Sequence, residues 1–278
     1  MGEAARADDG VRHDPSEHAA RQCLPHTARM DRAQASAIAH RWHPIAAPLS
    51  DESVALAVRR LQVPENGRVL DLGSGFGEWL LAAVGPVPTA QGVGVDSSAP
   101  AVAEARERAA RRALDQRVTF EQADAATWSG CAFDAVICIG ASHAFGGLGP
   151  TLTAARRHLR PGGRLLLGDG FWEAGPSPAA LEALGATPDE LPTIGELVAE
   201  AGRQGFEPGH GHISTAAEWD AYEWAWTGAL ATWALTEASD DDRDEALGLA
   251  RDHRRQWLEG YRGQLGFVTV VLHDLGER

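Results

Sequence analysis

Short apolar segments that alternate with helical patterns limit the fold of this chain more than any other feature. Five such segments lie between residues 68 and 170: "RVLDLG", "AQGVGVD", "RVTFEQAD", "FDAVICIG" and "RLLLGDG". Two later segments, "FEPGHGHI" and "LGFVTVVLHDL", predict two more strands. Apolar strands that alternate with amphipathic helices indicate a parallel sheet covered by helices on both faces. The pattern therefore predicts an α/β fold.

The first predicted strand runs into a turn that is rich in glycine. The stretch "VLDLGSGFGEWLL" (residues 69–81) places Gly73, Gly75 and Gly77 between a buried strand and a helix, with Asp71 just before them. Glycine lets a backbone approach a ligand closely, and the following helix offers unpaired N–H groups. A pyrophosphate site would use the spacing G-x-G-x-x-G, and Asp71 would repel it. A ligand that carries positive charge and a carboxylate, such as S-adenosylmethionine (SAM), suits this turn.

Acidic residues end the next two predicted strands. Asp96 closes "GVGVD", where its carboxylate can accept hydrogen bonds from two ribose hydroxyls. Asp124 closes "EQAD", where it can meet an adenine amino group beside the Ala125 backbone. Both positions agree with a ligand that contains a nucleoside.

These motifs together resemble those of the class I SAM-dependent methyltransferases. The matching stretches are "VLDLGSGFG", "GVGVD", "QAD", "FDAVICIG" and "LRPGGRLLLGD", and the resemblance covers roughly residues 50–213 and the last strand. It implies a Rossmann-like, mostly parallel seven-stranded sheet whose final strand is antiparallel, with SAM as the cofactor. The residues that the resemblance assigns to the cofactor are Asp71, Gly73, Ser74, Gly75, Gly77, Asp96, Ser97, Asp124, Ala125 and Gly140.

Methyl transfer is an in-line displacement, so the protein supplies alignment, exclusion of water and, where needed, a base. The segment "IGASHAFGG" after the fourth strand offers His143 as the candidate base. The alternative is a loop histidine that bonds to backbone or lines the cofactor. After the fifth strand, "GDGFWE" offers Asp169, Trp172 and Glu173; Trp172 is a candidate substrate contact, and Asp169 could equally be structural.

A tryptophan-rich helical insertion over residues 215–260 is predicted before the last strand. In "EWDAYEWAWTGALATWAL" the residues Trp219, Tyr222, Trp226 and Trp233 follow helical spacing and share one face. These rings could simply pack the insertion onto the sheet. Alternatively the insertion is a substrate lid in which Trp219, Tyr222 and Trp226 contact the acceptor, with Glu223 or Tyr261 fixing a polar end.

The remaining segments divide the chain into parts. Residues 1–30 lack periodicity and predict a mobile tail ahead of one methyltransferase domain over 31–278, and Met30 is an alternative start. Residues 171–193 hold four prolines and predict an active-face loop. The segment "HRWHPIAAPLS" before the glycine turn either folds over the cofactor through His40, Trp42 and His43 or packs without a ligand role.

Composition excludes several classes of function. The net charge of −14 argues against a nucleic-acid partner. All 25 basic residues are arginine, so Schiff-base catalysis, pyridoxal phosphate anchoring and a P-loop lysine are excluded. No apolar run reaches membrane-span length, a secretory signal is lacking and the cysteines are few, so we expect no membrane association and a cytoplasmic protein. "IGASHAFGG" has no acids for a metal, and His210 and His212 lack a third ligand, so no metal site is expected.

The sequence therefore predicts SAM-dependent methyl transfer to a small, apolar or aromatic metabolite. One alternative is a nicotinamide-dependent oxidoreductase, which the glycine spacing and Asp71 disfavour. Another is a SAM-binding scaffold that acts through a protein partner without catalysis. The acceptor, the methylated atom and the oligomeric state stay open.

Overall fold

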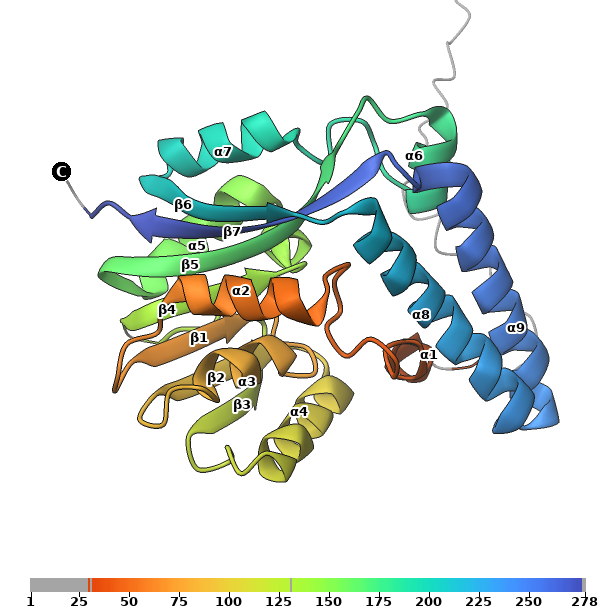
Figure 1. The fold of residues 1–278 in the computed structure, drawn as a ribbon, viewed down its shortest axis with the longest axis horizontal. Coiled ribbons are helices and arrows are strands. Elements are labelled where there is room, and N and C mark those ends of the chain that lie inside the picture. The colour runs from red at the N-terminus through yellow and green to blue at the C-terminus, as the bar shows by residue number, and fades with distance from the viewer. Residues whose placement is uncertain (1–29, 31, 131, 277–278) are drawn as a thin grey trace, which may run out of the picture.

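The computed structural model describes residues 30, 32–130 and 132–276, so residues 1–29 of the tail predicted over 1–30 lie outside them. Seven strands form one sheet in the order β3-β2-β1-β4-β5-β7-β6 (Figure 1). All neighbours pair in parallel except β7, which is antiparallel to β5 and β6. The predicted sheet and its antiparallel final strand are confirmed. The strands are β1 (Arg68–Leu72), β2 (Gln91–Asp96), β3 (Val118–Gln122), β4 (Phe133–Ile139), β5 (Leu159–Trp172), β6 (Phe206–Ile213) and β7 (Leu265–Asp274).

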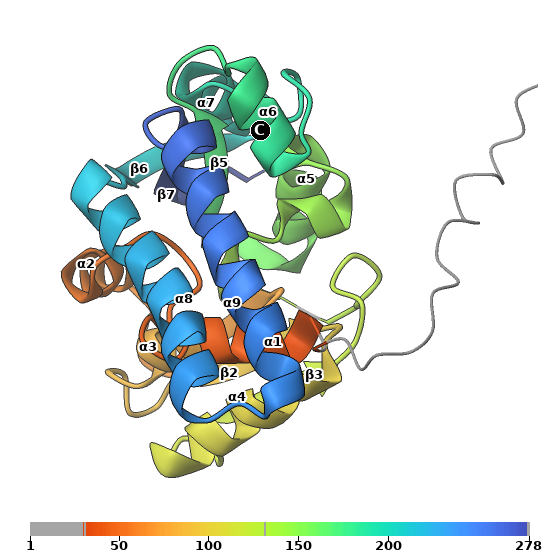
Figure 2. The same ribbon diagram turned by 90° about the vertical axis from the view of Figure 1, so that its right-hand side faces the viewer.

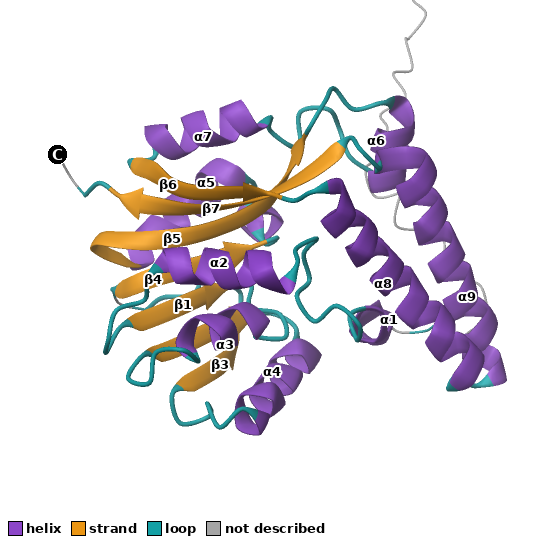
Figure 3. Ribbon diagram, in the orientation of Figure 1, coloured by secondary structure: helices purple, strands orange, loops and turns teal. Residues whose placement is uncertain are grey.

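Helices cover both faces of the sheet (Figure 3). One face carries α2, α3 and α4, and the other carries α5 and α7. A further group, α1, α6, α8 and α9, lies beyond the carboxyl ends of the parallel strands. The helices are α1 (Arg32–Ala39), α2 (Asp51–Leu61), α3 (Glu78–Val84), α4 (Ala99–Arg111), α5 (Leu148–His158), α6 (Pro178–Leu184), α7 (Ile194–Arg203), α8 (Ala216–Thr236) and α9 (Asp240–Arg255), with a 3₁₀ turn η2 (Ser142–Phe145) and a π-helical turn η3 (Gln256–Tyr261).

Alternating side chains of the central strands build two separate cores. Val69 of β1 packs with α2, α3 and α4, whereas its neighbours Leu70 and Leu72 pack toward α5 and α7. Successive side chains of a strand point to opposite faces, so a strand covered on both sides must be apolar at nearly every position. That requirement explains why "FDAVICI" is apolar at every position except Asp134.

The insertion between β6 and β7 folds as two long helices, α8 and α9, as predicted. They lie side by side (Figure 2), and in Figure 1 they stand beyond the carboxyl ends of the parallel strands. The α8 N-terminus carries a capping box in which Thr215 and Glu218 bond each other's backbone. Met30 and Ile38 pack against α8 and α9, so the segment before the sheet joins this helical layer.

The prediction of a continuous loop over residues 171–193 is wrong in part. Phe171 and Trp172 belong to β5, and the segment contains the helix α6. The Ser177 side chain caps α6, Pro178 sits at its first turn, and Gly185 ends it in the left-handed conformation. Proline is favoured at the first turn of a helix, so a proline-rich segment does not exclude one. In the part of the chain that the structure describes, no helix is long and apolar enough to span a bilayer.

Candidate cofactor and acceptor sites

The glycine turn takes a backbone conformation that only glycine adopts readily. Gly73, Gly75 and Gly77 have φ values of +75°, +50° and +79°. A Cβ on Gly73 would lie 2.5 Å from the Ala141 Cβ, whereas a Cβ on Gly75 would meet nothing within 4 Å. Gly73 therefore allows close packing of two loops, and Gly75 leaves open space above the turn.

Asp96 at the end of β2 is bonded to that turn. Its Oδ2 accepts a hydrogen bond of 2.8 Å from the Gly75 N–H, and its Oδ1 accepts one of 2.8 Å from the Ser98 N–H. A carboxylate offers about four lone-pair sites, so two stay available for ribose hydroxyls. Asp124 is arranged in a similar way, because its Oδ1 accepts the Ala126 N–H at 2.9 Å.

A cavity of about 920 Å³ lies above the glycine turn, and we call it the cofactor cavity. Its walls join the ends of β1, β2 and β4 to α1 and α8, segments far apart in the sequence. The residues predicted for the cofactor that line it are Gly73, Ser74, Gly75, Asp96, Ser97, Asp124, Ala125 and Gly140, and His143 lines it too. The contacts of Asp96 and Asp124 with a nucleoside stay a prediction, and the space at Gly75 is open on the side of the cavity where the amino-acid end of SAM is expected.

Asp71 and Gly77 do not line the cofactor cavity. Asp71 is 2% exposed and lies beneath the turn, where its Oδ2 has no hydrogen-bond partner among the described residues. Burial is the main cause that raises the pKa of Asp71 to about 8, and the nearby Asp96 carboxylate adds to it. A hydrogen bond from the Leu80 backbone acts in the opposite direction. With that pKa the Asp71 carboxyl is mostly protonated at neutral pH, and its place beneath the turn gives it no direct contact with the cofactor cavity.

Helix α8 and the end of α1 supply further walls of the cofactor cavity; the sequence indicated His40 as one alternative but not Arg41 or Trp233. Trp233 lines the cofactor cavity from α8, and His40 and Arg41 line it from the end of α1. The Tyr222 hydroxyl lies 3.3 Å from His40 Nε2, and its ring makes an edge contact with His43 at 5.3 Å between centroids. His40 thus lies where it could contact a bound cofactor, whereas His43 packs on Tyr222 and does not line the cavity.

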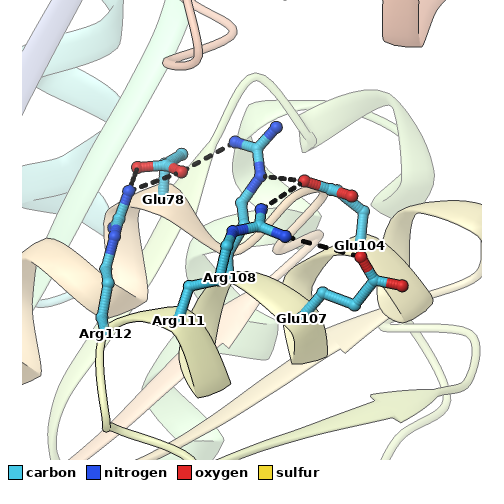
Figure 4. Close-up of polar contacts among 6 residues, drawn as sticks. All are labelled: Glu78, Glu104, Glu107, Arg108, Arg111 and Arg112. Carbon is cyan, nitrogen blue, oxygen red and sulfur yellow. Dashed lines mark hydrogen bonds and ion pairs between the residues drawn. The ribbon is translucent and has the colours of Figure 1, made fainter.

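An ion-pair network supports the cofactor cavity from below (Figure 4). The Glu78 carboxylate at the start of α3 accepts hydrogen bonds from Arg108 at 2.7 Å and from Arg112 at 2.8 Å. Arg108 also bonds Glu104 at 2.8 Å, and its guanidinium lies 5.1 Å from the centroid of the Phe76 ring. Glu78, Glu104 and Arg108 line the cavity, so these pairs tie α3 to α4 at its floor.

A second cavity, of about 1120 Å³, adjoins the first at His143, which lines both. Trp172, Asp169 and Glu173 line this second cavity as well, so the structure brings the predicted base together with the three candidates at the end of β5. His143 is exposed on η2 and therefore accessible to a bound molecule. Burial raises the pKa of Asp169. Hydrogen bonds from Ser142 and the Gly170 backbone, together with the nearby His143, partly offset this rise.

The aromatic residues of the insertion separate into different environments. Trp219 and Tyr261 line a third cavity of about 200 Å³, which we call the indole pocket. Tyr222 and Trp226 line neither the second cavity nor the indole pocket. The Trp226 ring stacks on His253 at 4.0 Å, and Tyr222 packs on the segment after α1. Glu223 is buried and accepts hydrogen bonds of 2.7 Å from the Tyr261 hydroxyl and from His253, so it joins α8 to α9 and η3.

The two histidines of β6, His210 and His212, have different surroundings. His212 bonds Glu218 at 3.0 Å, and His210 Nε2 is buried without a partner in the described part of the chain. Among the described residues no group of three or more His, Cys, Asp or Glu side chains gathers as metal ligands would.

Comparison with known proteins gives consistent matches. A family model described as a methyltransferase domain matches residues 69–163. The chain is 30% identical over 216 residues to the uncharacterized protein YjhP of Escherichia coli K12, covering 76% of this chain and 86% of that protein. It is 35% identical over 150 residues to 27-O-demethylrifamycin SV methyltransferase of Amycolatopsis mediterranei, covering 51% and 53%. The crystal structure of a SAM-dependent methyltransferase from Geobacter sulfurreducens with S-adenosylhomocysteine superposes with a TM-score of 0.78 at 28% identity, covering 88% and 98%.

Proposed function

The chain belongs to the class I SAM-dependent methyltransferases, and we propose that it methylates a small, mostly apolar or aromatic acceptor held in the second cavity. The observation that carries this proposal is the shared wall at His143. A methyl donor bound over the glycine turn and an acceptor bound beside Trp172 would meet there. Neither alternative, an oxidoreductase or a scaffold without catalysis, gains support from the comparisons.

The His143 imidazole is the proposed base. The cofactor supplies a methyl group that its sulfonium already activates. His143 would accept the proton that an O–H or N–H acceptor loses when it is methylated. Asp169, buried beside His143, would stabilise the imidazolium that results. General-base assistance of this kind contributes about 10²–10⁴-fold to the rate.

The charge of the second cavity limits the acceptor. Five carboxyl side chains line it and no arginine does so among its described walls; the acids are Asp169, Glu173, Asp189, Glu190 and Glu196. Like charges repel, so an anionic acceptor is disfavoured. The Phe171 and Trp172 rings offer apolar surface for a neutral one. The rifamycin methyltransferase acts on an oxygen, which supports testing hydroxylated acceptors first.

The proposal is tested by binding and then by turnover. Calorimetry should show that SAM and S-adenosylhomocysteine bind and that NAD and NADP do not. Methyl-labelled SAM should then transfer label to neutral phenols, and the matching phenols with an added carboxylate should react more slowly. Nicotinamide binding without SAM binding would contradict the assignment of SAM as the cofactor. Faster labelling of the carboxylated acceptors would contradict the proposed class of neutral acceptors.

A further inference from the structure

Arg108 has one side-chain nitrogen that is left for a ligand. Its Nη1 donates to Glu78 at 2.7 Å and its Nε donates to Glu104 at 2.8 Å. The third nitrogen, Nη2, bonds no described residue, and in Figure 4 it carries no dashed line. It is not among the buried atoms that lack a partner, so it is accessible to solvent. Since Arg108 lines the cofactor cavity, this N–H group is available to a molecule bound there.

The Arg108 guanidinium is held in place before any ligand binds. The two carboxylates fix two of its nitrogens, and its central carbon lies 5.1 Å from the centroid of the Phe76 ring. Only 17% of the side chain is exposed. A guanidinium that is already fixed loses little conformational freedom when it binds a carboxylate, and partial burial strengthens its electrostatic interactions.

The partners of Arg108 do not use up its charge. Each of the two carboxylates has a second arginine partner, Arg112 for Glu78 at 2.8 Å and Arg111 for Glu104 at 2.9 Å. Arg108 is therefore not the sole cation that neutralises these acids. A further carboxylate next to Nη2 would meet a positive charge rather than two unbalanced negative ones.

The position of Arg108 matches the amino-acid end of the cofactor. Gly75 leaves open space above the turn, and Phe76, the next residue, lies against the Arg108 guanidinium. The His40 ring at the end of α1 lies 6.3 Å from the Phe76 ring between centroids. Burial is the main cause that lowers the pKa of His40, and the Arg108 charge adds to it. The charge of Arg108 therefore acts in the part of the cavity between the glycine turn and the end of α1.

We propose that Arg108 Nη2 binds the carboxylate at the amino-acid end of SAM. Among the described residues one other arginine, Arg41, lines the cofactor cavity. Arg41 donates to both oxygens of Glu237, and both side chains are about half exposed, so water screens its charge. The inference rests on the cofactor of the proposed function and not on its acceptor.

Two ligands isolate the contribution of the carboxylate. S-adenosylhomocysteine carries this group, and decarboxylated S-adenosylhomocysteine lacks it but keeps the amine. Each is titrated into the full chain by calorimetry. The wild type should bind S-adenosylhomocysteine at least about 10-fold more tightly than the decarboxylated ligand. In Arg108→Gln this ratio should fall to about 2 or less, because only the affinity for S-adenosylhomocysteine drops.

Arg112→Gln is the matched control for a structural effect. It breaks the other ion pair of Glu78, yet Arg112 does not line the cofactor cavity. The ratio of the two affinities should stay at the wild-type value in this variant. Arg108→Met, which keeps an unbranched chain over Phe76 and removes the charge, serves if Arg108→Gln fails to fold. Thermal unfolding without ligand shows whether each variant is folded.

Three outcomes overturn the inference. The first is an equal loss of affinity for both ligands in Arg108→Gln, which would make Arg108 structural only. The second is a wild-type chain that binds the two ligands equally. The third is a ratio that falls in Arg41→Gln and not in Arg108→Gln, which would assign the carboxylate to Arg41. Failure of neutral phenols to accept label, with the expected ratios, would contradict the proposed acceptor alone.

Discussion

The Gly75 backbone N–H donates a hydrogen bond of 2.8 Å to the Asp96 carboxylate, so the glycine turn after β1 and the acid that ends β2 form one unit. The same carboxylate bonds the Ser98 N–H in front of α4. Asp96 therefore has two tasks, because it orders the turn and presents its remaining lone pairs to the cofactor cavity.

Replacement of Asp96 tests both tasks. Asp96→Ala should weaken SAM binding about 10- to 100-fold, because charge-assisted hydrogen bonds to ribose are lost along with the support of the turn. Calorimetry with S-adenosylhomocysteine measures the dissociation constant. Asp115→Ala, an exposed acid between α4 and β3, is the matched control and should bind normally. An unaltered dissociation constant for Asp96→Ala would remove this residue from the site.

His143→Ala separates catalysis from cofactor binding. Turnover should fall about 10²–10⁴-fold while the affinity for SAM stays nearly the same, because the imidazole accepts the proton of the acceptor. The limb of the pH–rate profile that reports the base should also disappear. If the variant loses SAM affinity and keeps its turnover at saturation, His143 is only a wall of the cofactor cavity.

The buried Asp71 should make the folded state less stable as pH rises. Its pKa is about 8 in the folded protein against 3.8 for an ordinary aspartate. The protonated Asp71 carboxyl therefore contributes to the free energy of unfolding in full below pH 3.8, and this contribution is lost as pH rises to about 8. Asp71→Asn cannot ionise. Urea unfolding should show that the free energy of unfolding of the wild type falls by roughly 2–3 kcal/mol, relative to that of Asp71→Asn, between about pH 5 and about pH 7.5. Parallel pH profiles for the two proteins would contradict this assignment.

Glu218 should anchor the insertion to the sheet domain. Burial alone would raise its pKa, but hydrogen bonds from Ser53, Ser50, Thr215 and His212 lower it to about 2. Its stabilising effect is therefore present above 4.5 and is lost as pH falls through about 2. Glu218→Gln should reduce the free energy of unfolding at neutral pH by about 1–3 kcal/mol.

Glu196 provides the matched control for Glu218. It closes the same kind of capping box, with Thr193 at the start of α7, but it is exposed and bonds only that cap. Glu196→Gln should therefore destabilise the protein less than Glu218→Gln when both are measured by urea unfolding. Equal losses would mean that the cap alone, and not the bonds to Ser50 and Ser53, explains the effect.

Tyr222 and Trp233 should act on the cofactor rather than on the acceptor. Tyr222→Phe removes the contact with His40, and Trp233→Phe reshapes a wall of the cofactor cavity. Each should weaken S-adenosylhomocysteine binding about 5-fold, the effect of roughly one hydrogen bond or its packing equivalent. Leu235→Ala, at an exposed position of α8, should leave binding unchanged. If Tyr222→Phe instead raised only the Michaelis constant for the acceptor, the result would support the substrate contact predicted for Tyr222 from the sequence.

The strands and the glycine turn could be predicted from the sequence because their signals are local. A strand buried on both faces must be apolar at nearly every position, and a turn with positive φ values needs glycine. The stretch "VLDLGSGFG" therefore predicts both the strand and the turn. The proline-rich segment over 171–193 was less readable, because a serine cap and a proline at the first turn allow a helix that composition hides.

The amino-acid sequence by itself determined the succession of the seven strands along the chain, the glycine turn, the acid that ends β2 and the acid that follows β3, but not helix α6. Only the tertiary structure decided which side chains of α8 meet a cavity. Helical spacing shows that Trp219, Tyr222, Trp226 and Trp233 share a face, but what that face meets depends on segments far away in the chain. The segment after α1 meets Tyr222, η3 meets Trp219 and α9 meets Trp226. Periodicity records the repeat of one helix, whereas packing depends on the position of its neighbours.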